Sequence, residues 1–215
     1  MIELYGVSVR YPGCLALRDL SLALRPGVTL VHGPSGAGKS TLLRIVATLL
    51  PPDQGQVRYP WENGGPGSLD RLRARIGYVP QESRLPQTFS CVDALRYLAA
   101  VRGLSSSRRD VEPLLARWGL WPVRARCLDR LSTGEARRWL LAQSQLANPD
   151  LWILDEPSRS LDAEAMQTLR AELALYATSI RTGALRFALV AAQDSHLDGL
   201  AQRVVHLERG QIAHR

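Results

Sequence analysis

Lysine is nearly absent from this chain of 215 residues, because one of its 27 basic side chains is lysine and the other 26 are arginine. Cysteine is also scarce, and Cys14, Cys91 and Cys127 are scattered and lack the spacing of a metal site. This usage excludes a disulfide framework and favours a reducing compartment. No apolar run approaches the roughly 18 residues of a membrane-spanning helix, and the first residues do not form a signal-peptide pattern.

The chain is basic, with a formal net charge of +7. Its arginines are spread along the sequence, and no group of aromatic residues accompanies them as a stacking platform. A solvated basic surface, or attraction to an anionic membrane face or a polar partner, explains this pattern better than a nucleic-acid partner, so no nucleic acid is expected. The densest groups are Arg71, Arg73 and Arg75, and Arg124, Arg126 and Arg130.

The single lysine, Lys39, lies in residues 33–41, GPSGAGKST, which match the phosphate-loop pattern G-x-x-x-x-G-K-[ST]. A compact ammonium fits a backbone that wraps closely around phosphates better than a planar guanidinium does. Apolar residues 28–32 and 42–46 predict a strand before this phosphate loop and a helix after it. We expect Lys39 to contact the β- and γ-phosphates and the Ser40 hydroxyl to bind Mg²⁺. The predicted nucleotide-binding residues of the loop are Gly33, Pro34, Ser35, Gly36, Ala37, Gly38, Lys39, Ser40 and Thr41.

A second chemical site is predicted at residues 151–157, LWILDEP, where an apolar strand ends in the adjacent carboxylates of Asp155 and Glu156. Buried carboxylates are costly unless a cation compensates their charge, and Mg²⁺ supplies such compensation. We expect Asp155 to hold the metal and Glu156 to polarise the attacking water.

A third segment, residues 131–135 (LSTGE), begins an apolar helical stretch. Taken alone, Ser132 and Glu135 form a capping box that starts a helix. The segment gains a further meaning because it stands between the phosphate loop and the strand with two carboxylates.

The apolar pattern predicts an α/β phosphate-loop core with a helical insertion. Strands are expected near residues 2–10, 20–24, 28–32, 56–59, 76–79, 151–154, 185–191 and 203–207, a helix-rich stretch at 92–130, and helices at 134–147 and 162–178.

With these segments in this order, the chain resembles the ABC-family ATPases, the nucleotide-binding subunits of transporters, over essentially its whole length. Tyr11 matches the aromatic residue that stacks on adenine in that family, and Gln81 matches the glutamine that links the active site to the membrane partner. Residues 131–135 are similar to the signature LSGGQ, and residues 160–162 resemble the loop that communicates across the dimer. Residues 47–55 and 76–82 are most similar to ATPases of simple bacterial exporters.

The resemblance implies a single ABC ATPase domain, residues 1–215, with a mixed sheet and an N-terminal antiparallel portion. Residues 1–82 and 150–215 would form the nucleotide-binding core, and residues about 83–149 a helical subdomain that carries the signature.

The resemblance also implies ATP hydrolysis with Mg²⁺ in a head-to-tail homodimer or heterodimer that drives a transmembrane subunit. The chain would then lie in the cytoplasm, on the inner face of the cell membrane. Ser132 and Gly134 would contact the ATP of the partner, Gln81 would join Ser40 and Asp155 at the metal, and Glu156, Lys39 and Gln193 would be catalytic.

The sequence departs from the family pattern at three positions. Thr133 replaces a glycine, Glu135 replaces a glutamine and adds a negative charge beside the phosphate of the partner, and Gln193 stands where a switch histidine is usual. Glutamine donates a hydrogen bond but carries no positive charge. We expect slowed hydrolysis, or work opposite a second, different ATPase subunit, and His196 is the alternative switch residue.

Two alternatives are less well supported. A soluble ABC-type ATPase of DNA repair would need a long coiled coil, but only 49 residues lie between Gln81 and Leu131, and ribosome-acting relatives carry two cassettes. A phosphate-loop kinase would have no use for residues 131–135 or for the Gln81 segment.

Overall fold

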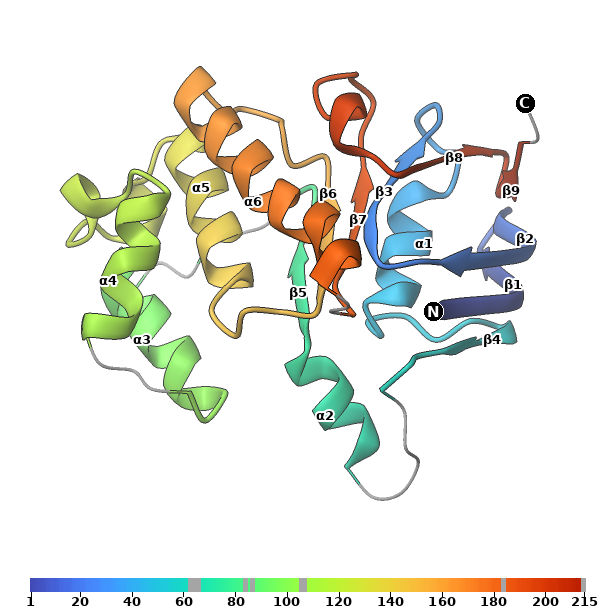
Figure 1. Cartoon of the computed structure of the whole chain (residues 1–215), viewed down its shortest axis with the longest axis horizontal. Helices are drawn as coiled ribbons and strands as arrows, with labels where there is room; N and C mark the ends of the chain where they lie inside the picture. The colour runs from blue at the N-terminus through green and yellow to red at the C-terminus, as the bar shows by residue number, and fades with distance from the viewer. Residues whose placement is uncertain (62–66, 83–84, 86–87, 105–107, 183–184, 214–215) are drawn as a thin grey trace.

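A six-stranded sheet runs through the middle of the computed structural model, which describes residues 1–61, 67–82, 85, 88–104, 108–182 and 185–213 (Figure 1). The strand order is β5-β6-β7-β3-β8-β9, and every neighbouring pair is parallel except β8 and β9. Alternation of strands and helices along the chain favours this parallel arrangement. The strands are β3 (Gly27–His32), β5 (Ile76–Val79), β6 (Leu151–Asp155), β7 (Phe187–Ala191), β8 (Arg203–Glu208) and β9 (Gln211–Ile212).

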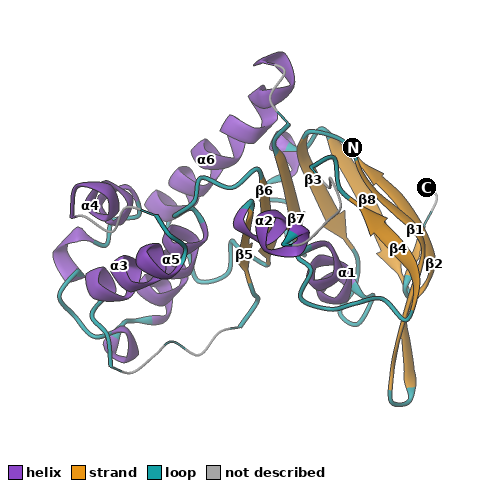
Figure 2. Ribbon diagram, turned by 90° about the horizontal axis from the view of Figure 1, so that it is seen from below, coloured by secondary structure: helices purple, strands orange, loops and turns teal. Residues whose placement is uncertain are grey.

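A three-stranded antiparallel sheet, in the order β2-β1-β4, forms a separate layer. It contains β1 (Ile2–Tyr11), β2 (Cys14–Leu24) and β4 (Gln54–Arg58). Along β1, Ile2 and Leu4 are buried and Glu3 is not, as expected of a strand with one face on a core. Helix α1 (Lys39–Val46) lies between the two sheets and packs against both (Figure 2).

Helices cover the other face of the six-stranded sheet and extend away from it. α3, α4 and α5 lie at the end of the molecule opposite β1 and β2 (Figure 1). The helices are α2 (Ser68–Ala74), α3 (Cys91–Val101), α4 (Arg108–Arg117), α5 (Thr133–Ser144) and α6 (Ala163–Thr182), with short 3-10 turns η1 (Trp121–Val123), η2 (Leu128–Arg130) and η3 (Asp198–Leu200).

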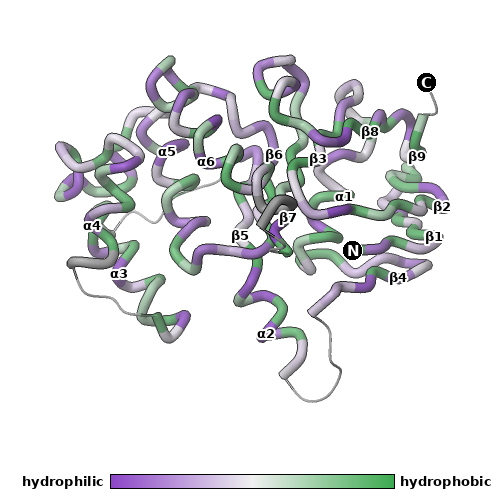
Figure 3. Tube along the Cα trace, in the orientation of Figure 1, coloured by the Kyte–Doolittle hydropathy of each residue, from purple (hydrophilic) through white to green (hydrophobic). Residues whose placement is uncertain are grey.

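Strand β6 contributes to both sides of the sheet, because successive strand residues point to opposite faces. Leu151 and Ile153 pack with α1 and the three-stranded sheet, whereas Trp152 and Leu154 pack with the helices. The indole Nε1 of Trp152 donates a hydrogen bond of 2.8 Å to Ser144 Oγ, so its polar tip is satisfied. Figure 3 shows the hydrophobic character along the central strand β3 and the mixed character of α5 and α6.

The predicted fold class is confirmed, with a mixed sheet, an N-terminal antiparallel portion and a helical region before β6. The strand expected at 20–24 is only the second half of β2, and the stretch 92–130 separates into α3, α4 and two 3-10 turns. α2 and β9 were not predicted, because α2 buries only Leu72 and β9 has two residues. No helix of the described ranges has the length and apolar character needed to cross a membrane. The boundaries of the proposed helical subdomain stay a prediction.

The close approach of β5 to the end of α5 generates a stability prediction. A Cβ at Gly77 would lie 2.2 Å from the carbonyl oxygen of Ser144, whereas a Cβ at Gly199 would meet nothing within 4 Å. We expect Gly77→Ala to lower the free energy of unfolding by about 1–3 kcal/mol, since a backbone must move. Gly199→Ala should change it by less than about 0.5 kcal/mol. Urea unfolding of both variants tests this, and equal effects would contradict it.

Candidate active site

One cavity of about 330 Å³ brings together most of the residues predicted from the sequence. It lies beyond the carboxyl ends of β3 and β6, where ligands bind in open α/β sheets. Ala16 of β2 also borders it and was not predicted. The predicted residues that line it are Tyr11, Pro34, Ser35, Gly36, Ala37, Gly38, Lys39, Ser40, Thr41, Gln81, Asp155, Glu156 and Gln193.

The phosphate loop folds back over its own lysine. Lys39 is buried as a residue, and its Nζ donates hydrogen bonds to the carbonyl oxygens of Gly33, at 2.6 Å, and Pro34, at 3.2 Å. Gly38 has a φ of 102°, and a Cβ there would lie 2.5 Å from the carbonyl oxygen of Ala16, so this position requires glycine. The loop therefore closes directly onto β2 and leaves the first turn of α1 at the border of the cavity.

Asp155 and Glu156 are held out of water at the end of β6, with exposed fractions of 2% and 8%. Burial raises the pKa of Asp155, while a hydrogen bond from Ser40 acts in the opposite direction. Burial also raises the pKa of Glu156, and the main-chain N–H of Gln193 acts in the opposite direction. Within the part of the chain that the structure describes, Asp155 Oδ1 and Glu156 Oε1 have no hydrogen-bond partner. Such oxygens are costly to bury unless a ligand or cation meets them.

The free Oδ1 of Asp155 fits an oxygen-coordinated cation such as Mg²⁺, which takes one or two carboxylates and completes its shell with phosphates and water. Within the described ranges, no group of three or more histidine, cysteine, aspartate or glutamate side chains is placed so that it could hold a metal ion by itself.

Gln193, which follows β7, reaches both the phosphate loop and the carboxylates. Its Nε2 lies 3.2 Å from Ser35 Oγ, and its main-chain N–H donates to Glu156 Oε2 at 3.3 Å. His196 lies apart from the residues that line the cavity: its side chain is 65% exposed and its Nδ1 is 3.5 Å from Asp194 Oδ1. Of the two candidate switch residues, the fold brings Gln193 to Glu156.

Ser132 and Gly134 are not among the described residues that line this cavity; they lie at the start of α5. Ser132 Oγ accepts from the N–H of Glu135 at 3.2 Å, and Glu135 Oε2 accepts from the N–H of Ser132 at 2.8 Å. The predicted capping box is therefore confirmed. Gly134 has a packing role within the chain as well, since a Cβ there would lie 2.9 Å from the carbonyl oxygen of Ser160.

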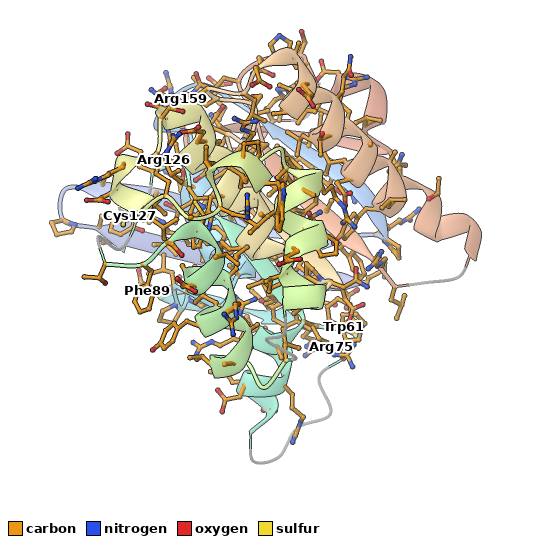
Figure 4. All side chains as sticks on the ribbon, turned by 90° about the vertical axis from the view of Figure 1, so that its left-hand side faces the viewer. Trp61, Arg75, Phe89, Arg126, Cys127 and Arg159 are labelled. Atoms are coloured by element: carbon orange, nitrogen blue, oxygen red, sulfur yellow. The ribbon has the colours of Figure 1, made fainter. Side chains whose placement is uncertain are left out.

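The negative charge of Glu135 is paired within the chain. Arg126 Nη1 donates to both oxygens of the Glu135 carboxylate, at 2.9 and 3.1 Å. Arg126 and Cys127 are labelled in Figure 4, which views the molecule from the side where the helices lie. The pKa of Glu135 is lowered chiefly by the hydrogen bond from the main chain of Ser132, and also by Arg126.

Sequence reasoning missed Arg137, a buried residue whose guanidinium donates to the carbonyl oxygen of Asp155 and to that of Pro80, next to Gln81. The helical periodicity of α5 could have predicted that Arg137 is buried. Arg137 stands three and four residues before Leu140 and Leu141, on the buried face of α5.

Comparison with known proteins agrees with this geometry. The family model described as ABC transporter matches residues 17–159. The chain belongs to the ABC transporter family. It is 38% identical over 172 residues to the zinc import ATP-binding protein ZnuC of Alcanivorax borkumensis, which covers 79% of this chain and 61% of that protein. It is 36% identical over 172 residues to the cytochrome c biogenesis ATP-binding export protein CcmA of Cupriavidus necator, with 78% and 74% covered.

The match therefore spans only about three fifths of the length of the ZnuC relatives. Among solved structures, a dimeric bacterial ABC transporter cassette superposes with a TM-score of 0.84 at 22% identity, covering 100% of this chain and 97% of the other. A dimeric post-hydrolysis cassette with ADP and Pi gives a TM-score of 0.83 at 21% identity, with the same coverage. At these identities, the solved structures establish the fold.

The ionised carboxylate of Glu135 generates a pH prediction. Because its pKa is lowered in the folded chain, its contribution to stability is present above the unfolded pKa and is lost as the pH falls through the folded pKa. We expect Glu135→Gln to lower the free energy of unfolding by about 1 kcal/mol at pH 7, and by progressively less below about pH 4. Urea unfolding over this pH range measures the difference.

Glu208→Gln, at an exposed carboxylate of β8, is the matched charge control. It should change the free energy of unfolding by less than about 0.5 kcal/mol at pH 7. A Glu135→Gln effect that stayed constant from pH 7 to below pH 4 would show that the ionised form contributes nothing.

Proposed function

We propose that this chain is an ATP-binding subunit that binds and hydrolyses ATP with Mg²⁺ and drives a separate transmembrane subunit. The observation that supports the proposal most strongly is a cavity of about 330 Å³ at which the phosphate loop, Asp155, Glu156 and Gln193 meet. Membership of the ABC transporter family supports it, as do relatives named as ATP-binding proteins of zinc import and of cytochrome c biogenesis export.

The nucleotide would lie along the first turn of α1. Tyr11, at the exposed end of β1, offers a ring for stacking on adenine. The phosphate loop offers main-chain N–H groups to the phosphates, and Lys39 would exchange its contacts with loop carbonyls for contacts with the β- and γ-phosphates.

Ser40, Gln81 and Asp155 would hold Mg²⁺, and the unpaired Oδ1 of Asp155 supports this assignment. When bound, the ion would neutralise charge on the β- and γ-phosphates. Gln81 borders this cavity and also a larger one of about 660 Å³ beside α5, so it stands between the nucleotide and the helical region.

Glu156 is the proposed base. Its Oε2 is fixed by the N–H of Gln193, and its Oε1 is free to accept a hydrogen bond from water. Burial raises its pKa, which makes the carboxylate a better proton acceptor near neutral pH. The Gln193 side chain, next to Ser35, would donate a neutral hydrogen bond to the γ-phosphate.

We propose a head-to-tail dimer, a homodimer or a heterodimer with another ATPase subunit, in which Ser132 and Gly134 at the start of α5 face the nucleotide of the partner. A capped helix start supports this, since its dipole and remaining N–H groups attract a phosphate. Residues about 83–149 would act as the helical subdomain within one domain, and residues 160–162 would communicate across the dimer. The transmembrane subunit would hold the chain on the cytoplasmic face of the membrane.

Glu156→Gln tests the proposed function directly. We expect ATP binding to persist while turnover falls about a hundredfold or more, because the amide cannot take a proton from water. Gel filtration with ATP and Mg²⁺ should then show a dimer that the unmutated chain forms only transiently.

Lys39→Ala is the control for the site itself, and it should lose ATP binding as well as turnover, since no other ammonium can replace it. Normal turnover in both variants would contradict the proposed function.

Gln193→His tests the departure from the family pattern. An imidazole that carries a proton adds charge to a hydrogen bond that is now neutral, a gain of roughly 1–2 kcal/mol. We therefore expect turnover to rise about three- to thirtyfold, with a steeper dependence on pH near the pKa of histidine. His196→Ala should leave turnover unchanged. Loss of turnover in His196→Ala, with no effect of Gln193→His, would instead assign the switch to His196.

A further inference from the structure

Arg137 of α5 is a buried cation that is bound almost entirely by main-chain carbonyl groups. The residue is 5% exposed. Nη1 donates to the carbonyl oxygen of Pro80 at 2.6 Å, and Nη2 donates to those of Asp155, at 2.6 Å, and Glu156. Nε points at the carbonyl oxygen of Pro157 at 3.4 Å. One guanidinium thus joins three segments: α5, the end of β5 and the end of β6.

Burial of a charged guanidinium costs free energy, which only its contacts inside the protein can offset. Among the described residues Arg137 forms no salt bridge. Burial lowers its pKa to about 10, although the nearby carboxylates of Asp155 and Glu156 act in the opposite direction, so the group stays protonated at neutral pH. The carbonyl groups of Pro80, Asp155 and Glu156 and the carboxylates of Asp155 and Glu156 thus compensate together for the buried charge.

The segment that Arg137 binds has a strained backbone. Glu156 has a φ of 50°, in the left-handed region that residues other than glycine rarely occupy. Such a conformation persists only where the surroundings over-determine it. Arg137 binds the carbonyls on both sides of the Glu156 Cα, those of Asp155 and Glu156, and thereby fixes the direction in which the Glu156 side chain leaves the strand.

We propose that Arg137 is a positioning residue that holds the left-handed Glu156 turn and the Gln81 segment against α5, and so sets where the Glu156 carboxylate stands beside the phosphate loop. The inference rests on the proposed function. It adds that Arg137 ties the helix bearing residues 131–135 to Glu156, the proposed base of the same chain.

Chemical rescue tests this role. Arg137 borders the open cavity of about 660 Å³, so Arg137→Ala leaves a space that a guanidinium ion can enter from solvent. We expect Arg137→Ala to lower kcat at least tenfold with KM and ATP affinity within about threefold, because the phosphate loop is untouched. Millimolar guanidinium chloride, far below denaturing concentration, should restore at least a third of the lost kcat.

Leu141→Ala is the matched control, since Leu141 is a fully buried residue of the same helix that does not border either cavity. It should reduce stability, and guanidinium should not change its kcat. Arg137→Lys should recover only part of the activity, because one ammonium cannot span carbonyls from two strand ends.

An independent measurement uses no turnover. Amide hydrogen exchange of peptides covering 78–82 and 154–160 should accelerate in Arg137→Ala and not in Leu141→Ala. An Arg137→Ala variant with normal kcat, or one without rescue and with exchange like that of Leu141→Ala, would overturn the positioning role while leaving the proposed function intact. An unmutated chain that neither binds nor hydrolyses ATP would instead overturn the proposed function, and this inference with it.

Discussion

The removal of two adjacent carboxylates from water at the end of β6 is the constraint on which the site depends. Asp155 and Glu156 are nearly fully buried and raise each other's cost of ionisation. Their charge is compensated from separate elements. For Asp155 these are chiefly the Ser40 hydroxyl and the Arg44 guanidinium of α1, then Arg137 of α5 and Lys39. For Glu156 they are the N–H of Gln193 after β7 and then Lys39. A shift of any of these elements would leave part of this buried charge uncompensated. The packing of the layers therefore determines whether both carboxylates can be ionised.

The register of the parallel sheet brings the compensating groups to the two carboxylates. Val31 of β3 and Asp155 of β6 both pair with Ala191 of β7, so these three strands end side by side. The chain leaves β3 into the phosphate loop, β6 into Glu156 and β7 into Gln193, and the three exits converge at the cavity. Lys39 and Glu156, 117 positions apart in the sequence, thus meet without long side chains reaching across the molecule.

Local sequence signals predicted the parts of the site that are built locally. Three features consist of contiguous residues: the phosphate loop with its apolar strand, glycines and lysine, the strand before Asp155, and the cap at Ser132. Short or tertiary features were not predictable in this way: β9 has two residues, and the need for glycine at position 77 arises from the approach of Ser144. The role of Arg137 depends on carbonyl groups 18 to 57 positions away, which no local pattern encodes. The pairing of Glu135 with Arg126 was likewise not predicted, because it is set by the tertiary fold.

The start of α5 shows how one helical turn can satisfy two demands. Side chains satisfy the N–H groups of Ser132 and Glu135, and the carboxylate used for this is neutralised by Arg126. Among the hydrogen bonds of the described residues, the main-chain N–H groups of Thr133 and Gly134 have no acceptor, as expected for the first residues of a helix. The turn is therefore fixed within its own chain by one set of atoms, and in the proposed dimer the N–H groups of Thr133 and Gly134 would face a phosphate of the partner's nucleotide. Because Arg137 lies one turn further along the same helix, a phosphate bound at those two N–H groups would act on a helix already fastened to Glu156. In the proposed dimer, the nucleotide of one subunit would thus be linked through a single helix to the base of the other.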